Sequence, residues 1–188
     1  MMKDLFLLYI HGYGSNRESR KFFNIKESLP DFPAAVFEWD EDTNFELLLE
    51  TAIKQTSEIE QILLIGDSTG ANIAYQIREV RKSLGLSTIL VLTSPLLDYN
   101  KRLRTDLVFS ENLQNSLMQI NKVEDALVIL AKEDEVIDYS QFNVKQDAPN
   151  STVIYVDDSH RLEGFINYVG YIIGYIVNKS VRPELEAL

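Results

Sequence analysis

The sequence predicts a three-layer α/β domain, in which a mostly parallel sheet of about six strands is covered by helices on both faces. Short apolar runs alternate along the chain with segments whose apolar residues recur at helical spacing. The apolar runs are continuous rather than alternating with polar residues, which is typical of parallel strands buried on both faces. A chain of 188 residues, 45% of them hydrophobic, can bury one core, so we expect a single domain spanning 1–188.

The first two strands are expected at 5–10 and 34–39. The first is the run Leu-Phe-Leu-Leu-Tyr-Ile, and a basic helical stretch near Lys21 follows it. The second, Ala-Ala-Val-Phe-Glu-Trp, precedes a helix over 43–56. The apolar residues of that helix fall on one face, which predicts that it packs on the sheet; they are Phe45, Leu48, Leu49, Ala52 and Ile53.

The third and fourth strands are expected at 62–65 and 88–92, with a helix between them. Gly85 follows this helix as a stop signal. The segment 96–124 has helical patches without a clean period, and we expect it to form a small cap insertion over the site. Residues at helical spacing predict the buried face of the intervening helix; they are Ile73, Ile77, Val80 and Leu84.

The last two strands are expected at 126–131 and 152–156. A short helix is predicted over 139–146, between these strands. The final helix is predicted from an apolar face made of Phe165, Val169, Ile172, Ile173 and Ile176.

The stretch ILLIGDSTGANIAYQI, residues 62–77, indicates a strand, a tight turn and a helix with Ser68 at the apex. Side chains at Gly66 and Gly70 would clash where the strand and helix approach each other. Ser68 would then adopt a strained backbone that exposes its hydroxyl at the helix N-terminus. The Gly-x-Ser-x-Gly pattern alone is weak evidence, because a tight turn in a non-catalytic parallel sheet would look the same.

The rest of the chain supplies the partners that a nucleophilic serine needs. A serine hydroxyl requires a base to take its proton, and the base requires a carboxylate to hold it. Asp134 follows the fifth strand and His160 follows the sixth, so both fall on the same sheet edge as Ser68. Asp138 is an alternative acid in the same loop, but Asp134 lies nearer the strand end, where this fold places the acid.

Two backbone N–H groups are expected to form an oxyanion hole, one after the serine and one in the loop after the first strand. The Thr69 N–H follows the serine, and the Tyr13 N–H follows His11 and Gly12. Two such backbone donors could stabilise a developing oxyanion. We interpret His11 as structural, with its ring hydrogen-bonded to loop backbone and holding the oxyanion turn.

Four segments together resemble the small YqiA-like esterase family of α/β-hydrolases: YIHGYGSN, GDSTGANIAY, KEDEVIDYSQ and DDSHRLEGFINYVGYI. The resemblance implies an α/β-hydrolase fold and esterase activity on short acyl chains. By position, it makes Ser68 the nucleophile, Asp134 the acid and His160 the base. The family pattern ends in Gly-Gly where this chain has Gly70 and Ala71. The predicted function is therefore a serine hydrolase that cleaves small carboxylic esters, or thioesters, through an acyl-enzyme.

Two alternatives remain at this point. Gly66-Asp67-Ser68 also opens the motif of GDS-type lipases, and Asp157-x-x-His160 fits their closing motif. In that arrangement Asp157 would be the acid and Asp134 would be dispensable. The chain could also be a non-catalytic hydrolase-like binding module, which need not react covalently at Ser68.

Composition excludes several other classes of protein. A net charge of -11 argues against binding a nucleic-acid backbone. There is no cysteine, which excludes disulfides and thiolate metal sites, and there are only two histidines. The proposed chemistry needs neither a cofactor nor a metal, so the expected partner is a small-molecule ester. The basic pair Arg102 and Arg104 could bind an acidic substrate, but we interpret it as solvated surface.

The expected cellular location is based on the length of the apolar runs and on the absence of a cleavage site. The run near the N-terminus is only six residues long and has no small-residue cleavage site, so we expect no signal peptide. No run is long enough to span a bilayer. We therefore expect a cytoplasmic protein, and no pattern in the sequence sets an oligomeric state.

Overall fold

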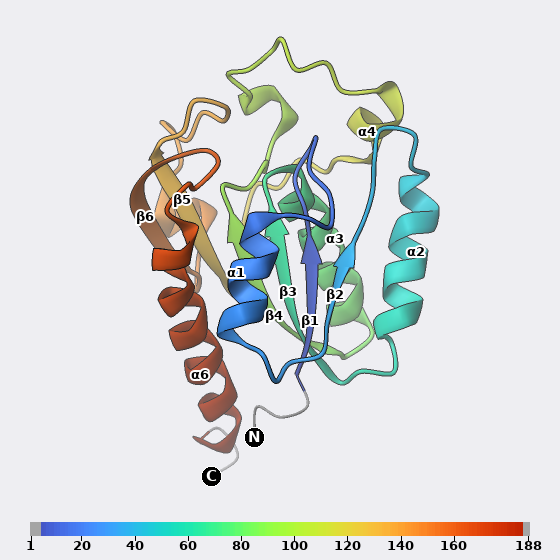
Figure 1. The fold of residues 1–188 in the computed structure, drawn as a ribbon, viewed down its shortest axis with the longest axis vertical. Helices are drawn as coiled ribbons and strands as arrows, with labels where there is room; N and C mark the ends of the chain where they lie inside the picture. Colours follow the sequence, from blue (N-terminus) through green and yellow to red (C-terminus); the bar gives the residue numbers. More distant parts are fainter. Residues whose placement is uncertain (1–4, 186–188) are drawn as a thin grey trace.

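A computed structural model describes the backbone of residues 5–185 and the side chains of residues 5–179. Six strands form one sheet in the order β2-β1-β3-β4-β5-β6, and every neighbouring pair is parallel (Figure 1). The predicted fold class is confirmed, and the sheet is wholly rather than mostly parallel. The strands are β1 Phe6–Ile10, β2 Ala34–Phe37, β3 Gln61–Asp67, β4 Ser87–Thr93, β5 Ala126–Glu133 and β6 Thr152–Ser159.

Helices cover both faces of this sheet (Figure 1). The α-helices are α1 Arg20–Ser28, α2 Phe45–Thr56, α3 Thr69–Ser83, α4 Glu111–Ser116, α5 Val144–Asp147 and α6 Val169–Leu185. Helices α1 and α6 pack on one face, and α2 and α3 pack on the other. Within residues 5–185, no helix is both long enough and apolar enough to cross a bilayer.

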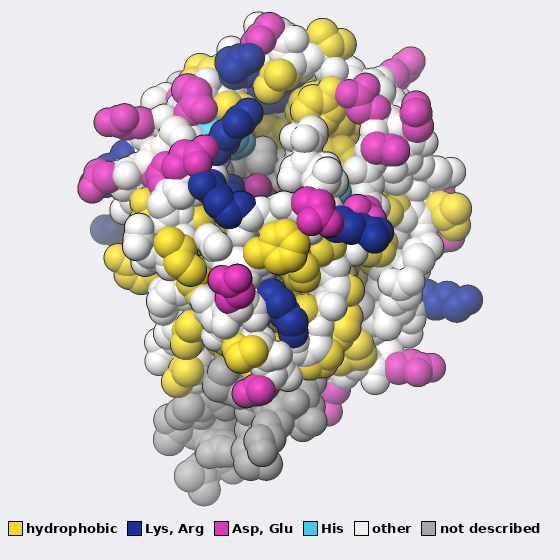
Figure 2. Space-filling view, in the orientation of Figure 1, with side chains coloured by type: hydrophobic (Ala, Val, Ile, Leu, Met, Phe, Trp, Pro, Cys, Tyr) yellow, Lys and Arg dark blue, Asp and Glu magenta, His cyan; other side chains and the backbone are white. Residues whose placement is uncertain are grey.

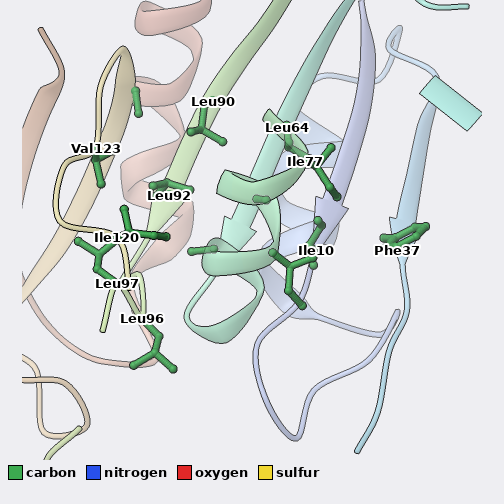
Figure 3. Packing of buried hydrophobic residues seen from close by; sticks show 14 of the residues in the cluster. Ile10, Phe37, Leu64, Ile77, Leu90, Leu92, Leu96, Leu97, Ile120 and Val123 are labelled. Atoms are coloured by element: carbon green, nitrogen blue, oxygen red, sulfur yellow. The ribbon is translucent and has the colours of Figure 1, made fainter. Parts of the chain in front are cut away.

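The core lies in two layers because successive residues of each strand point to opposite faces of the sheet. In β1, Leu7 and Tyr9 belong to the layer under α1 and α6, whereas Leu8 and Ile10 belong to the layer under α2 and α3. Figure 3 shows the second layer, where strand side chains meet Ile77 of α3. Each fully buried aliphatic side chain of this kind contributes about 1.5–3 kcal/mol to stability.

The predicted buried face of α3 is wrong at its C-terminal end. Val80 and Leu84 are 39% and 56% exposed, while Arg81 is fully buried. The Arg81 guanidinium donates to the carbonyls of Ile59 and Ser87, both at 2.9 Å, so its charge is solvated by backbone oxygens. A buried arginine does not contribute to the pattern of apolar residues. The pattern therefore assigns Val80 and Leu84, rather than Arg81, to the buried face of the helix.

Three element boundaries also differ from the sequence prediction. Strand β2 ends at Phe37, and Trp39 lies beyond the strand. The short helix expected over 139–146 is confined to α5, because the Tyr139 hydroxyl donates to the carbonyl of Pro95 at 2.8 Å and holds that residue in the preceding loop. The final helical segment divides into a 3₁₀ turn, Phe165–Tyr168, and α6.

Strand register places the chemistry at one edge of the sheet. Ile10 of β1 pairs with Gly66 of β3, so the residues that follow these two strands are neighbours. Glu133 of β5 pairs with Ser159 of β6, which makes the next residues of both strands neighbours as well. The strand order reverses at β1, and ligand sites of parallel sheets lie at the carboxyl edge near such a reversal.

Candidate active site

Ser68 stands between β3 and α3 in a backbone conformation that L-residues rarely adopt. Its φ is 51° and its ψ is -115°. Hydrogen bonds on both sides hold this geometry: the Ser68 N–H donates to the Thr93 carbonyl at 2.9 Å, and the Leu96 N–H donates to the Ser68 carbonyl at 3.0 Å. Such strain persists only where the surroundings over-determine it, and it is typical of functional sites.

Gly66 and Gly70 have the steric role that the sequence predicts. A Cβ on Gly66 would lie 2.5 Å from the Cα of Ala71, and one on Gly70 would lie 2.3 Å from the carbonyl oxygen of His11. Both contacts are far inside van der Waals distance and involve backbone atoms that cannot rotate away. Ala71, which departs from the family pattern, is fully buried beside this contact, and its methyl group is accommodated.

The structure brings Ser68, His160 and Asp134 together in one chain of contacts. His160 Nε2 lies 2.9 Å from Ser68 Oγ, and His160 Nδ1 lies 2.8 Å from Asp134 Oδ2. The Asp134 side chain is only 3% exposed. Its Oδ1 accepts from the backbone N–H groups of Val136 and Ile137, at 2.9 and 2.8 Å. These two bonds fix the carboxylate in the orientation that meets the imidazole.

The two other candidate acids do not contact His160. Asp138 accepts from the Ser140 N–H, and hydrogen bonding to Ser140 lowers the pKa of its carboxyl group. Asp157 is 88% exposed at its side chain and pairs with Lys132 at 2.7 Å. The geometry of the GDS-type alternative is therefore not the one the structure forms.

The turn after β1 lies directly against the serine. The Ser15 N–H donates to the Gly12 carbonyl at 3.1 Å, and Gly14 has a φ of +69°, which a type II turn requires at its third position. A Cβ on Gly12 would lie 3.1 Å from the Cβ of Ser68. In the part of the chain that the structure describes, neither the Tyr13 N–H nor the Thr69 N–H donates to another residue.

His11 is held as a neutral ring beneath this turn. Its Nδ1 lies 2.9 Å from the Gly12 carbonyl, so Nδ1 carries the proton, and its Nε2 accepts from the Trp39 N–H at 3.3 Å. The Trp39 indole stacks on the imidazole and donates from Nε1 to the His11 carbonyl. Burial lowers the pKa of His11, which keeps the ring uncharged. These contacts agree with a structural rather than a basic role.

Two polar features of the site have no motif in the sequence. Glu135 Oε2 accepts from the backbone N–H of His160 at 3.0 Å and so helps to place the imidazole. Lys21 Nζ lies 2.5 Å from Asp67 Oδ1, and both side chains are largely buried. The same Asp67 oxygen accepts from the Thr93 hydroxyl at 2.7 Å. A buried ion pair thus lies one residue before Ser68.

A cavity of about 680 Å³ opens beside these groups. Ser68, Thr69 and His160 line it, and the segment 96–124 contributes further lining residues, namely Leu96, Arg102, Arg104, Leu107 and Phe109. Figure 2 shows a hollow near the top of this face with Lys and Arg side chains around it. Among the described residues, no group of three or more His, Asp or Glu side chains is arranged to hold a metal ion.

Helix α3 anchors the segment 96–124, which contributes residues to the lining of the cavity. The amide nitrogen of Asn72 donates to the carbonyls of Leu96 and Met118, at 2.9 and 2.8 Å, and its oxygen accepts from the Met118 N–H. Gln76, one turn further along, donates to the Ser116 carbonyl. The two ends of the segment are therefore joined to the helix that follows Ser68.

The strain at Ser68 predicts a measurable cost in stability. We expect Ser68→Gly to be about 1 kcal/mol more stable than Ser68→Ala, because glycine adopts a positive φ without a Cβ clash and loses only part of this gain to unfolded-state entropy. Both variants lack the hydroxyl, so the comparison isolates the backbone term. Urea unfolding of the two proteins measures the difference, and equal midpoints with equal slopes would show that the turn is not strained.

The all-parallel sheet, its two helical layers and the strand-turn-helix at Ser68 define an α/β-hydrolase fold. The profile of the uncharacterised protein family UPF0227 matches residues 6–177, and the chain belongs to this family. It is the YqiA-like family that the four sequence segments resemble. A search of curated proteins finds no match.

Solved structures share the fold at low sequence identity. A provisionally assigned hydrolase from Agrobacterium vitis S4 has a TM-score of 0.74 at 16% identity, with 94% of this chain and 89% of that chain covered. The mouse α/β hydrolase domain-containing protein 10 has a TM-score of 0.68 at 12% identity, with 92% of this chain and 89% of that chain covered. A monoacylglycerol lipase from Paleococcus ferrophilus has a TM-score of 0.63 at 13% identity, with 90% of this chain and 94% of that chain covered. At these identities the neighbours show that the chain shares their fold.

Proposed function

We propose that this protein is a serine hydrolase that cleaves carboxylic esters, or thioesters, of small acyl substrates. The observation that carries the proposal is the contact chain from Ser68 Oγ through the His160 ring to Asp134, with distances of 2.9 and 2.8 Å. A cavity of about 680 Å³ next to Ser68 fits a small substrate. The segment 96–124 acts in this proposal as the cap that shapes the cavity.

In the first half-reaction, His160 Nε2 takes the proton from Ser68 Oγ as the oxygen attacks the acyl carbon. Asp134 holds the Nδ1 proton and stabilises the imidazolium that forms. The unused N–H groups of Tyr13 and Thr69 donate to the oxyanion of the tetrahedral intermediate. The imidazolium then gives its proton to the leaving alcohol or thiol, and the acyl group remains on Ser68.

In the second half-reaction, water takes the place of the serine hydroxyl. His160 accepts a proton from the water as its oxygen attacks the acyl-enzyme, and then returns a proton to Ser68 Oγ as the acid leaves. Every proton transfer uses the same imidazole nitrogen. The cycle therefore consumes one water and one ester, and it releases one acid and one alcohol.

Covalent labelling tests the proposal directly. We expect intact-mass analysis after treatment with a fluorophosphonate to show a single adduct on the wild-type protein and none on Ser68→Ala. Ser15→Ala serves as a matched control, because Ser15 lines the same cavity and has no basic partner in the proposed mechanism. A folded wild-type protein without an adduct would contradict the proposal and favour the non-catalytic binding module.

A further inference from the structure

The segment over the cavity holds one arginine in an unusual setting. The Arg102 guanidinium lies 3.8 Å from the ring centroid of Tyr99 and 4.6 Å from that of Phe109. Its Nε donates to the Tyr99 carbonyl at 3.2 Å, and its Nη1 donates to the Leu107 carbonyl at 2.7 Å. The side chain is half-buried and lines the cavity that contains Ser68. The expectation that Arg102 is solvated surface is therefore wrong.

Three other basic side chains of the cavity have carboxylate partners, whereas Arg102 has none. Arg104 forms a double hydrogen bond with Asp106, at 2.7 Å for both atoms, and is exposed. Arg20 pairs with Glu163, and Lys21 pairs with Asp67. Among the residues whose side chains the structure describes, no carboxylate pairs with Arg102. Acids outnumber bases 29 to 18 in the sequence, so the lack of a carboxylate partner is notable.

The hydrogen bonds of Arg102 leave a defined part of its donor set free. A guanidinium has five N–H groups in a planar fork, and two of them are used on backbone carbonyls. The remaining donors include both hydrogens of Nη2, and a fork of this kind binds a carboxylate through two parallel hydrogen bonds. The aromatic rings and the two carbonyls fix the plane of the fork, so little side-chain entropy is lost when an anion binds.

We propose that Arg102 is a specificity-determining residue that binds a carboxylate carried by the ester substrate. This inference rests on the proposed hydrolase function and names its substrate class. A monoanion is favoured over a phosphate dianion, because the carboxylates of Glu18 and Glu135 also line the cavity. Arg161 is exposed at the rim of the cavity. It adds a positive charge there but does not orient the bound carboxylate.

The test compares esters that differ only in the presence of the carboxylate. For an anion on the acyl side, the pair is mono(4-nitrophenyl) adipate and 4-nitrophenyl hexanoate. For an anion on the alcohol side, the pair is 4-acetoxybenzoate and 4-acetoxybenzamide. We expect kcat/KM to favour the anionic member of one pair by about 10- to 100-fold, which is the effect of one charge-assisted hydrogen-bond pair. The preferred pair identifies which side of the ester carries the anion.

Variants of the two loop arginines assign the preference to a residue. We expect Arg102→Gln and Arg102→Met to abolish the anionic preference while changing kcat/KM for the neutral ester by less than about threefold, since the reacting groups are untouched. Met retains an apolar stem between the two rings, so it keeps the test valid if Gln disturbs the loop. Arg104→Gln, on the same loop but paired with Asp106, should retain the full preference.

Each contrary result has a distinct meaning. Equal loss of activity on both members of a pair in both Arg102 variants would show a merely structural role and overturn the inference. Equal rates for both members in the wild type, or a stronger preference for 4-acetoxyphenyl phosphate than for 4-acetoxybenzoate, would overturn it as well. The absence of both hydrolysis and a fluorophosphonate adduct would instead overturn the hydrolase function on which it rests.

Discussion

Ester hydrolysis should fall by about four to six orders of magnitude when Ser68 is replaced by alanine, and by a similar factor in His160→Gln. The loss is large because the serine, the imidazole and the carboxylate act as one unit, so removal of any member disables the proton transfer. The double variant should be no slower than either single variant. Measurement of kcat/KM on a neutral 4-nitrophenyl ester, with circular dichroism to verify folding, provides the check.

The identity of the acid is tested by two further substitutions. Asp134→Asn should reduce kcat/KM by about 10,000-fold, because the amide cannot hold the required tautomer or stabilise the imidazolium. Asp157→Asn should leave kcat/KM unchanged, since Asp157 is exposed and pairs with Lys132. The opposite result, a severe loss in Asp157→Asn and a mild one in Asp134→Asn, would restore the GDS-type alternative.

The second large effect concerns stability rather than catalysis. Lys21→Met should lower the free energy of unfolding by about 3–5 kcal/mol, because it leaves the buried Asp67 carboxylate without its cation. The Thr93 hydroxyl still donates to that carboxylate, but an uncharged donor does not balance its negative charge. Urea unfolding at constant pH measures the loss.

Two controls separate the charge from the packing of Lys21. The double variant Lys21→Met/Asp67→Asn should recover part of the lost stability, because no uncompensated charge then remains in the site. Lys132→Gln breaks an ion pair whose two side chains are exposed, and it should leave the unfolding midpoint within error. A double variant less stable than Lys21→Met alone would show that the charge of Asp67 is not the source of the cost.

The fold was predictable because its signal is local and repeated. Six continuous apolar runs define six strands, and their alternation with helices forces the parallel arrangement. The sequence prediction fails where a polar side chain occupies a buried position that is usually apolar. Arg81 occupies a core position of α3 because backbone carbonyls solvate it, and no periodic pattern of apolar residues can reveal that.

The candidate site was predictable where a motif ties residues to strand ends. Ser68, Asp134 and His160 were found in this way, and the structure places them in contact. Lys21 was not found, because its role depends on a neighbour distant in sequence. Arg102 was considered for an acidic substrate but interpreted as solvated surface, because the sequence does not show how its guanidinium is held. Lys21 meets Asp67 46 positions away, and the unpaired state of Arg102 depends on the fold bringing no acid to it. Such features follow from tertiary structure alone.

The position of His160 on the last connection of the sheet has a consequence for biosynthesis. The serine and the histidine that would activate it are separated by 92 positions. At translation speeds of about 5–20 residues per second, roughly 5–20 s pass between the synthesis of the two residues. The elbow can fold first, but the proposed nucleophile has no base until β6 has joined the sheet. If the proposed mechanism holds, Ser68 of a nascent chain stays unactivated until β6 has been made and has joined the sheet.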